Sequence, residues 1–314
     1  MLDGILIIDK PEGLTSHDVV ARCRRILRTK KIGHTGTLDP FATGVMVVLV
    51  GRATRLAQFL DRDAKEYEAL VRFGFETDSG DRTGVKKEGE KGRRGEEETI
   101  GSGEIEAVLG GFRGEILQTP PMYSAKKVAG KKLYELARKG IEIERQPVRV
   151  NIYELELSDE WRGADGAAQS ADSLLSTLHS PLKVVCSAGT YIRVLAEDIG
   201  RALGTGAHLA ELRRTRAGKF GIERAVTLER LEELAAADGV GDILVSMNDA
   251  VAHLGEVRLS GEEAAKIRNG MKLKYVSGEY QDGATLRLTA DGELLAIGFY
   301  EAAEKIVQPR LVLV

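Results

Sequence analysis

One carboxylate in this chain stands in a setting suited to chemistry. Asp39 lies in a loop bounded by Gly33 and Gly44, directly before the apolar stretch 45–50. Glycines let another backbone approach closely, and a strand of valine and leucine holds its neighbours rigidly. The pattern predicts a side chain that is both fixed and reachable by a substrate. For the dipeptide Asp39-Pro40 alone, an ordinary turn is the simpler interpretation.

Several familiar kinds of site are missing from the sequence. It contains no GxxxxGK[ST] phosphate loop, no dinucleotide GxGxxG after a predicted strand and no GxSxG nucleophile elbow. Cys23 and Cys186 lack the paired spacing of a zinc site, and the five histidines form no metal-binding helix pair. We therefore predict no metal and two buried thiols. A lone aspartate with tyrosines and basic clusters suits a covalent reaction on a nucleobase removed from its stack.

Positive charge is clustered along the chain, although the formal net charge is -3. Any one such cluster is more often a solvated surface, but three clusters close to motifs favour contact with phosphates. The three groups are Arg22, Arg24, Arg25, Arg28, Lys30 and Lys31; Lys126, Lys127, Lys131 and Lys132; and Arg213, Arg214, Arg216 and Lys219.

The flanking sequence predicts the elements that would position these residues. Thr15 and Ser16 form a helix N-cap, and the apolar residues that follow repeat at helical spacing on one face. Gly204 is placed to end a second helix. The full set of expected elements is strands at 5–8, 45–50, 67–75 and 183–186, and helices after Thr15-Ser16 and over 191–203 and 227–237.

Length and composition predict two domains. A chain of 314 residues can bury one large core with a small second unit, and we place the boundary so that 1–248 form the first domain and 249–314 the second. Gly and Asp turns between short apolar runs make the second domain mostly β. Residues 85–104 and 162–180 are poor in large apolar side chains, so we expect two inserted surface loops, with a short helix around Leu174, Leu175 and Leu178 as an alternative in the second.

The overall composition is that of an ordinary globular protein. Hydrophobic residues make up 43% and charged residues 30% of the chain, and no apolar run is long enough to span a bilayer. The N-terminus lacks the basic start and cleavage site of a signal peptide. The sequence therefore predicts a cytoplasmic protein with no membrane partner.

Several blocks of sequence occur in a fixed order and carry a family resemblance. The first is the twelve-residue run around Asp39. The others are 4–11, 51–55, 65–67, 74–84, 118–126, 187–193 and 206–215. Together they resemble the TruB family of RNA pseudouridine synthases over most of residues 2 to 230. The stretches after Gly84 and Trp161 look longer than the usual connections of that family.

The resemblance implies a fold and a reaction. The fold is α+β, the pseudouridine synthase fold with a mixed, mainly antiparallel sheet flanked by helices, followed by a small β-rich PUA-like RNA-binding domain over 249–314. The reaction is isomerisation of uridine to pseudouridine at position 55 in the TΨC loop of tRNA, without a cofactor. Asp39 is the implied nucleophile on a flipped-out uridine, and attack on the uracil ring or on the ribose both remain open.

The resemblance also implies roles for five further residues. Arg193 matches the arginine that the family pairs with its aspartate, and Tyr67 matches a tyrosine that stacks on the uracil and is a candidate to remove its C5 proton. Tyr191 and Leu212 match positions that line the uracil pocket, and His34 matches a histidine that intrudes into the RNA loop. Without the resemblance, Arg193 would be interpreted as a surface cation and His34 as an ordinary loop histidine. Tyr67, Tyr191 and Leu212 would be interpreted as packing residues.

RNA contacts outside the pocket follow from the same comparison. Residues 118–147 resemble a segment that folds over bound RNA, and its lysines are suited to phosphates. Our candidates for contact with the RNA backbone are Lys126, Lys127, Lys131, Lys132, Arg213 and Arg214. The expected partner is the T-arm of tRNA, bound by a monomer that needs no obligatory protein partner.

Two other interpretations stay open at this point. A guide-RNA-dependent relative would work in a ribonucleoprotein, but the first motif begins within a few residues of Met1, which favours the stand-alone bacterial type. A non-catalytic RNA-binding or RNA-folding protein would use the basic clusters and leave Asp39 as a turn residue.

Overall fold

The architecture is described from a computed structural model. The described residues are 2–87, 100–124, 127–128, 131–133, 140–141, 143–162, 168–175, 178–274 and 280–313. Lys126 and residues 88–99 of the first expected loop lie outside them. No helix among these residues has both the length and the apolar character needed to cross a membrane.

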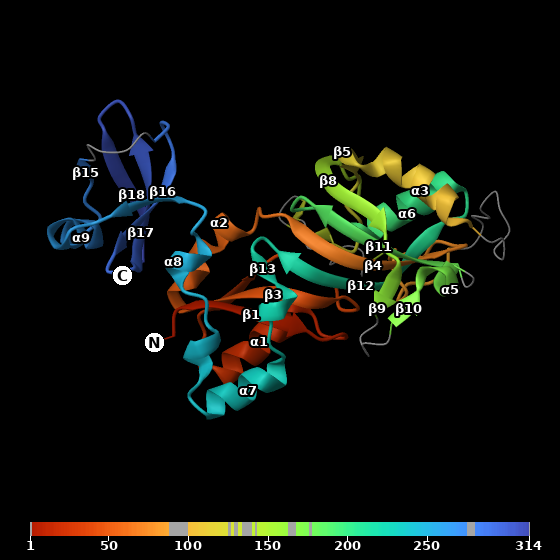
Figure 1. Ribbon diagram of the computed structural model, residues 1–314, viewed down its shortest axis with the longest axis horizontal. Coiled ribbons are helices and arrows are strands. Elements are labelled where there is room, and N and C mark those ends of the chain that lie inside the picture. Colours follow the sequence, from red (N-terminus) through yellow and green to blue (C-terminus); the bar gives the residue numbers. More distant parts are fainter. Residues whose placement is uncertain are drawn as a thin grey trace.

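A nine-stranded sheet forms the centre of the molecule (Figure 1). Its main path runs β1-β3-β12-β4-β11-β8-β5, while β2 pairs with β3 and β13 with β12. Among its described strand pairs only β12 and β3 run parallel, so the expected mainly antiparallel sheet is confirmed. The bounds are β1 (Gly4–Lys10), β2 (Ile32–Thr35), β3 (Thr43–Val50), β4 (Lys65–Phe73), β5 (Gly114–Gln118), β8 (Val148–Leu157), β11 (His179–Cys186), β12 (Ala207–Ala217) and β13 (Phe220–Gly221).

Helices cover different parts of this sheet, because alternate strand residues present an apolar surface that must be buried. In Figure 1, α3 (Ser102–Leu109) and α6 (Ile192–Leu203) lie over the β4, β8 and β11 region, and α1 (Ser16–Ile26) and α7 (Leu228–Ala236) lie below β1 and β3. The short elements are η1 (Gly51–Leu56), α2 (Ala57–Leu60), η2 (Gly110–Phe112), η3 (Ile222–Arg224), η4 (Val240–Ile243) and α8 (Met247–Ala250).

Two predicted helix boundaries are confirmed by their caps. The Thr15 side chain accepts a hydrogen bond from the Asp18 backbone while the Asp18 carboxylate accepts one from Thr15, which is a capping box. Gly204 ends α6 in the left-handed conformation with φ 73°, where a residue without Cβ is favoured. Local sequence therefore directs where α1 begins and where α6 ends.

The central position of β12 was not foreseen. Its sequence carries His208, Glu211, Arg213, Arg214 and Arg216, which are uncommon residue types for a strand at the centre of a sheet. The strand instead lies between β3 and β4. Each of these charges therefore needs a partner inside the protein or at a sheet face.

The expected second surface loop is wrong in part. Residues within 162–180 form β10 (Ala168–Ser170), which pairs with β9 (Glu160–Arg162), then α5 (Ala171–Leu175) and the start of β11. Trp161 is buried with Leu70, Leu174 and Ala210 on the sheet face opposite α6. One tryptophan and one leucine thus anchor a segment whose average composition suggested a loop. The first expected loop ends earlier than 104, because α3 begins at Ser102.

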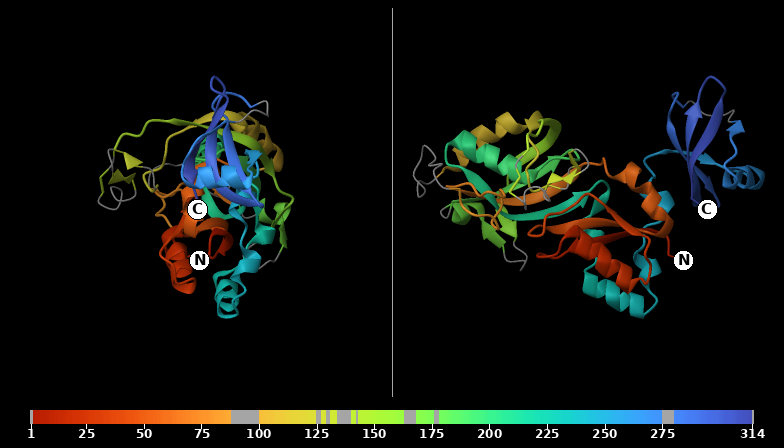
Figure 2. Two further views of the ribbon diagram at one scale, coloured as in Figure 1. Left: turned by 90° about the vertical axis from the view of Figure 1, so that its left-hand side faces the viewer. Right: turned by 180° about the vertical axis from the view of Figure 1, so that it is seen from behind.

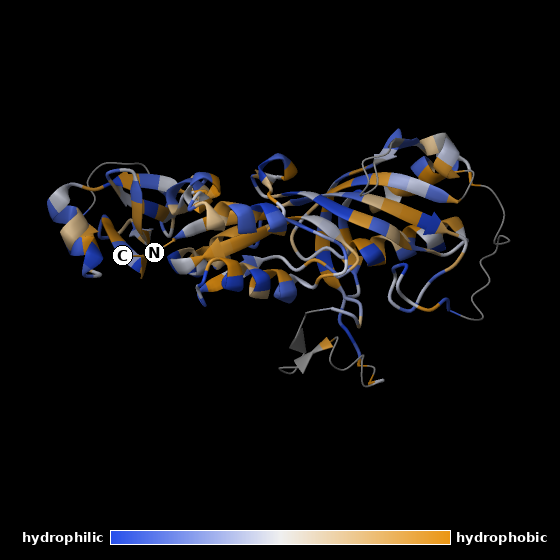
Figure 3. Ribbon diagram, turned by 90° about the horizontal axis from the view of Figure 1, so that it is seen from below, coloured by the Kyte–Doolittle hydropathy of each residue, from blue (hydrophilic) through white to orange (hydrophobic). Residues whose placement is uncertain are grey.

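A second, five-stranded sheet follows at one end of the elongated molecule (Figure 2). Its strand order is β14-β16-β17-β18-β15, and its strands carry both hydrophobic and hydrophilic residues (Figure 3). Leu294, Ile297 and Leu311 pack into a cluster with the first sheet, and the Arg52 guanidinium donates to the carbonyl of Leu313 at 2.8 Å. The bounds are β14 (Gly255–Arg258), α9 (Gly261–Arg268), β15 (Leu273–Lys274), β16 (Thr285–Ala290), β17 (Glu293–Glu301) and β18 (Ile306–Val312).

The anchoring role of Trp161 gives a stability prediction. Trp161→Ala removes a buried indole and is expected to lower the free energy of unfolding by about 3 kcal/mol. Tyr153→Ala removes an aromatic side chain that is 55% exposed and is expected to cost no more than about 0.5 kcal/mol. Urea unfolding followed by circular dichroism compares the two variants. Equal midpoints would contradict the buried packing of this segment.

Candidate active site

Asp39 lies on the loop that joins β2 to β3, and three elements hold that loop. The Ser16 hydroxyl, at the start of α1, donates to the Leu38 carbonyl at 3.1 Å and accepts from the Leu38 backbone at 2.9 Å. The Pro40 carbonyl accepts from the Gly13 backbone at 2.8 Å and from the buried Lys10 ammonium at 3.2 Å. The residues on either side of Asp39 are therefore fixed.

The structure explains why the residue that ends the same loop, Gly44, is a glycine. It has φ 98°, and a Cβ placed there would lie 2.2 Å from the carbonyl oxygen of Arg214. No side chain fits at that distance, so only glycine lets β3 meet β12 this closely. Arg214 is 1% exposed, and its guanidinium donates to the carbonyls of Val45 at 2.7 Å and Gly36 at 3.1 Å. The central strand thus also holds the start of the Asp39 loop.

Arg193, in the first turn of α6, binds the carboxylate of Asp39 through two of its guanidinium nitrogens. Its Nε lies 2.9 Å from Oδ2 of Asp39, and its Nη2 lies 3.1 Å from Oδ1. The Arg193 side chain is 5% exposed, whereas that of Asp39 is 34% exposed. A bidentate pair of this kind fixes the orientation of the carboxylate while one side stays open.

The charges around Asp39 act in opposite directions on its pKa. Burial raises the pKa of Asp39 above its usual value, and the nearby Asp81 carboxylate also raises it, while Arg193 and Lys10 lower it. Burial lowers the pKa of Lys10 to about 8, although Asp39 opposes that change. Arg193 is therefore the group that does most to favour the ionised form of Asp39.

The remaining donors of Arg193 connect it to two further segments. Its Nη1 donates to the Ser79 carbonyl at 2.7 Å and lies 3.9 Å from Oδ2 of Asp81, and its Nη2 donates to the Tyr123 carbonyl at 2.7 Å. Oδ1 of Asp81 is itself held by the Thr83 backbone at 2.9 Å. Arg193 is thus positioned by loops on both sides of the carboxylate that it orients.

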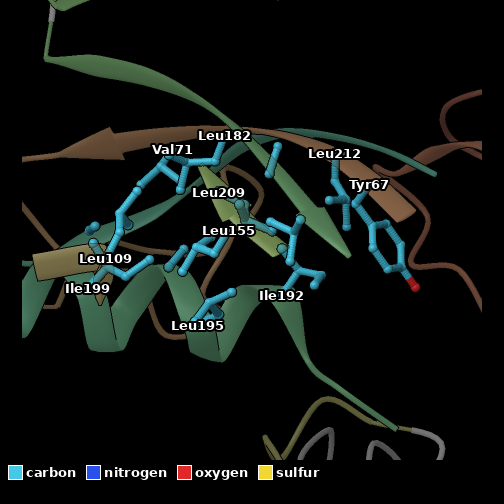
Figure 4. Close-up of a cluster of buried hydrophobic side chains, with 14 of the residues drawn as sticks. Tyr67, Val71, Leu109, Leu155, Leu182, Ile192, Leu195, Ile199, Leu209 and Leu212 are labelled. Atoms are coloured by element: carbon cyan, nitrogen blue, oxygen red, sulfur yellow. The ribbon is translucent and has the colours of Figure 1, made fainter. Parts of the chain in front are cut away.

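A cavity of about 270 Å³ opens beside this pair. Its lining brings together six of the predicted site residues, namely Asp39, Tyr67, Tyr191, Arg193, Leu212 and Arg214. Figure 4 shows Tyr67 and Leu212 at one end of the core cluster, with the Tyr67 hydroxyl pointing away from it. Burial raises the pKa of the Tyr67 phenol, although Arg214 acts in the opposite direction. The size is at the lower end of ligand pockets and suits one nucleobase with part of its sugar.

Other predicted residues are not part of this cavity. His34 lies on β2, 6.4 Å from the His17 ring in a T-shaped arrangement, and is not among the lining residues. Lys126 lies outside the described residues. Lys127, Lys131 and Lys132 fall in the paired strands β6 (Lys127–Val128) and β7 (Lys131–Lys132).

The expected phosphate contact of Arg214 needs correction, while that of Arg213 stays a prediction. Arg214 is 1% exposed, lines the Asp39 cavity and bonds to backbone carbonyls through its guanidinium, so it faces the cavity and not the outer surface. Arg213 pairs opposite Glu68, on the sheet face away from the cavity, and its Nη2 lies 2.8 Å from Oδ2 of Asp9. Adjacent strand residues point to opposite faces, so the basic cluster of the sequence is divided by the strand that contains it.

Comparison with known proteins places this site in a family. Residues 24–192 match the profile of the TruB family pseudouridylate synthase (N terminal domain), and residues 193–252 match the tRNA pseudouridylate synthase B C-terminal domain. The chain belongs to the TruB family of pseudouridylate synthases. Among curated TruB relatives, the tRNA pseudouridine synthase B of Solibacter usitatus (strain Ellin6076) is 46% identical over 95% of both chains. That of Geobacillus thermodenitrificans (strain NG80-2) is 44% identical over 94% of both.

Two solved structures have the same fold as this chain. A chain in the crystal structure of a Cbf5-Nop10-Gar1 complex superimposes with a TM-score of 0.71 at 28% identity, over 99% of this chain and 85% of that one. A chain of an H/ACA RNP bound to a substrate RNA containing 2'-deoxyuridine gives a TM-score of 0.70 at 27% identity, with the same coverage. The pseudouridine synthase fold expected from the sequence is confirmed.

Two residues of this TruB site were missed as individuals, although both lie in the quoted blocks. Asp81 approaches Arg193, and Gln118, which is 1% exposed, accepts from the Tyr191 backbone at 2.9 Å and donates to its carbonyl at 3.2 Å. A buried amide that satisfies both groups of one residue fixes that residue in place. The sequence could not indicate these partners because they lie more than seventy residues apart.

The charge balance at Asp39 can be measured directly. Arg193→Gln removes the guanidinium, so the pKa of Asp39 is expected to rise further and its charge to be lost at a higher pH than in the wild type. Carboxyl carbon-13 NMR measures this titration, with Asp39→Asn used to assign the signal. Arg216→Gln breaks an Arg–Glu66 pair of 2.9 Å on the opposite face and serves as the matched control. A pKa that is the same in both variants would contradict the role given to Arg193.

Proposed function

We propose that this protein isomerises uridine to pseudouridine at position 55 in the TΨC loop of tRNA, with Asp39 as the nucleophile. One observation carries the proposal. A carboxylate oriented by a bidentate guanidinium lies on the wall of a cavity that is wide enough for one nucleobase. Relatives named tRNA pseudouridine synthase B align along nearly the whole chain, which supports tRNA as the substrate.

The reaction exchanges one bond to the sugar for another. The bond between N1 of uracil and C1' of ribose breaks, a bond between C5 and C1' forms, and the C5 proton is lost while N1 regains one. A base stacked in an RNA helix cannot reach the Asp39 cavity, so the nucleotide must be flipped out. Asp39 then attacks the uracil ring or the ribose carbon, and both routes need it ionised.

Four lining residues suit the flipped base. Leu212 and Tyr67 are buried, at 6% and 8% exposed, and offer an apolar wall and an aromatic ring for stacking. Arg214 and Lys65 bring positive charge to the same cavity. Cleavage of the glycosidic bond leaves negative charge on uracil, and fixed cations in a partly closed site stabilise such charge.

The rest of the chain suits a large RNA partner. We take residues 249–314 to be a PUA-like RNA-binding domain, joined to a catalytic domain of 1–248, because the five-stranded sheet has its own core. The substrate is then held at two places, the T-arm at the cavity and a more distant part of the tRNA at the second sheet. We propose that the enzyme acts as a cytoplasmic monomer without an obligatory protein partner, as a tRNA substrate and its bacterial relatives favour.

Replacement of the nucleophile tests the proposal. Asp39→Asn keeps the shape of the side chain and removes its charge, so no pseudouridine above background is expected in an unmodified tRNA transcript. RNA affinity is expected to stay within about threefold of the wild type, because binding uses many other contacts. Chemical mapping of pseudouridine and filter binding measure the two quantities.

The control is Asp238→Asn, an exposed aspartate in the left-handed conformation that asparagine also tolerates. It is expected to keep full activity. Conversion by wild type on bare tRNA separates the proposal from a guide-RNA-dependent enzyme. Tight RNA binding by wild type without any conversion would instead favour an RNA-folding protein.

A further inference from the structure

One hydroxyl at the active site has no partner within the protein. Oγ of Ser124 is buried, the residue is 6% exposed, and no protein atom lies within hydrogen-bonding distance and geometry. Four such side-chain atoms occur among the described residues, belonging to His34, Ser124, Trp161 and Ser180. Of these four residues, Ser124 alone lines the cavity that contains Asp39. A buried polar group without a partner is costly, so its position calls for an explanation.

The segment that carries Ser124 is held from three sides. Gln118 bonds both backbone groups of Tyr191, the Arg145 guanidinium donates to the Pro120 carbonyl at 3.2 Å, and Arg193 donates to the Tyr123 carbonyl at 2.7 Å. The last of these bonds comes from the same guanidinium that grips Asp39. Ser124 therefore occupies a fixed position close to the reacting carboxylate.

Three other polar side chains of the cavity already have partners within the protein. The Ser187 hydroxyl accepts from the Asn151 backbone at 2.9 Å, and the Thr190 hydroxyl donates to the Ser187 carbonyl at 2.9 Å. The Lys65 ammonium donates to the Asp61 carbonyl at 2.7 Å. Ser124 differs from them because its hydroxyl can both donate and accept, and neither capacity is used inside the protein.

We propose that the Ser124 hydroxyl binds the substrate, with a hydrogen bond to the flipped uridine in the Asp39 cavity. This inference rests on the proposed function. Uridine offers suitable partners on two sides, the 2'-hydroxyl of its ribose and the O2 and O4 atoms of its base. Ser124 directly follows the residue whose carbonyl Arg193 holds, so either partner would lie near the atoms whose bonds change.

The test compares two serine-to-alanine variants. Ser124→Ala is expected to reduce the single-turnover rate at subsaturating RNA about 5- to 10-fold. A loss of this size corresponds to the net contribution of one neutral hydrogen bond. Ser180→Ala is the matched control, because that hydroxyl is equally buried and unpartnered but lies in β11, away from the cavity. It is expected to keep the wild-type rate within about twofold. Neither variant is expected to lower the melting temperature, since neither hydroxyl bonds within the protein.

Modified substrates identify the partner of the hydroxyl. A T-arm hairpin carrying 2'-deoxyuridine, 2-thiouridine or 4-thiouridine at the target removes or weakens one candidate acceptor at a time. The modification that removes the partner of Ser124 is expected to reduce the affinity of Asp39→Asn protein for the hairpin. It is expected to cause no further loss of affinity in the Asp39→Asn, Ser124→Ala double variant. Sensitivity to the 2'-deoxy substitution assigns the ribose, and sensitivity to a thio substitution assigns the base.

Failure of this inference is distinguishable from failure of the proposed function. If wild type converts uridine and Ser124→Ala does so equally well, Ser124 does not bind the substrate. The inference also fails if the Ser124→Ala rate falls but no substrate change is coupled to it, because the residue then acts only on the protein. If wild type converts no uridine in the hairpin or in full-length tRNA, the proposed function itself is overturned.

Discussion

The pairing of Asp39 with Arg193 is the interaction on which the rest of the site depends. A carboxylate at the wall of a cavity loses hydration, and that loss favours its neutral form. A guanidinium in bidentate contact opposes the effect and fixes the orientation of the carboxylate. Arg193 is almost completely buried, so its other N–H groups need acceptors as well. Those acceptors come from the Ser79 and Tyr123 carbonyls, which bring two further loops to the cavity.

The strand β12 connects this site to the fold. Leu212 lines the cavity, Arg214 holds both β3 and the start of the Asp39 loop, and Arg213 bonds Asp9 on the opposite face. A charged strand at the centre of a sheet is stable only when every charge is paired, and here each pairing joins a different segment. The same residues that make β12 unusual as a buried strand thus fix the relative positions of β1, β3 and the loop.

Neither the segment of β9, β10 and α5 nor the five-stranded sheet covers the cavity. Trp161 and Leu174 attach the segment around β9, β10 and α5 to the sheet face opposite α6, where Arg213 also lies. The five-stranded sheet lies at the far end of β1 and β3 and shares an apolar cluster with them. An elongated body with the cavity on one face of its first sheet suits a long RNA partner better than a small molecule.

Several features of this protein were determined by the sequence itself. The capping box at Thr15, the left-handed Gly204 and the alternation of β4 depend on neighbours within a few residues, so local patterns were enough to predict them. These features share short range, because turns, caps and periodicity act over one or two helical turns. The role of Asp39 and the family followed instead from a resemblance carried by motifs in a fixed order over most of residues 2 to 230.

Only the tertiary structure decided which charges meet. The basic run 213–216 resembled a phosphate-binding cluster, but its position between β3 and β4 sends neighbouring arginines to opposite faces. The family resemblance implied that Arg193 pairs with Asp39, 154 residues away, but nothing in the sequence indicated that Gln118 meets a backbone 73 residues away. The role of a polar side chain depends on its partner, and long-range partners are fixed by sheet order and register, which no local pattern contains.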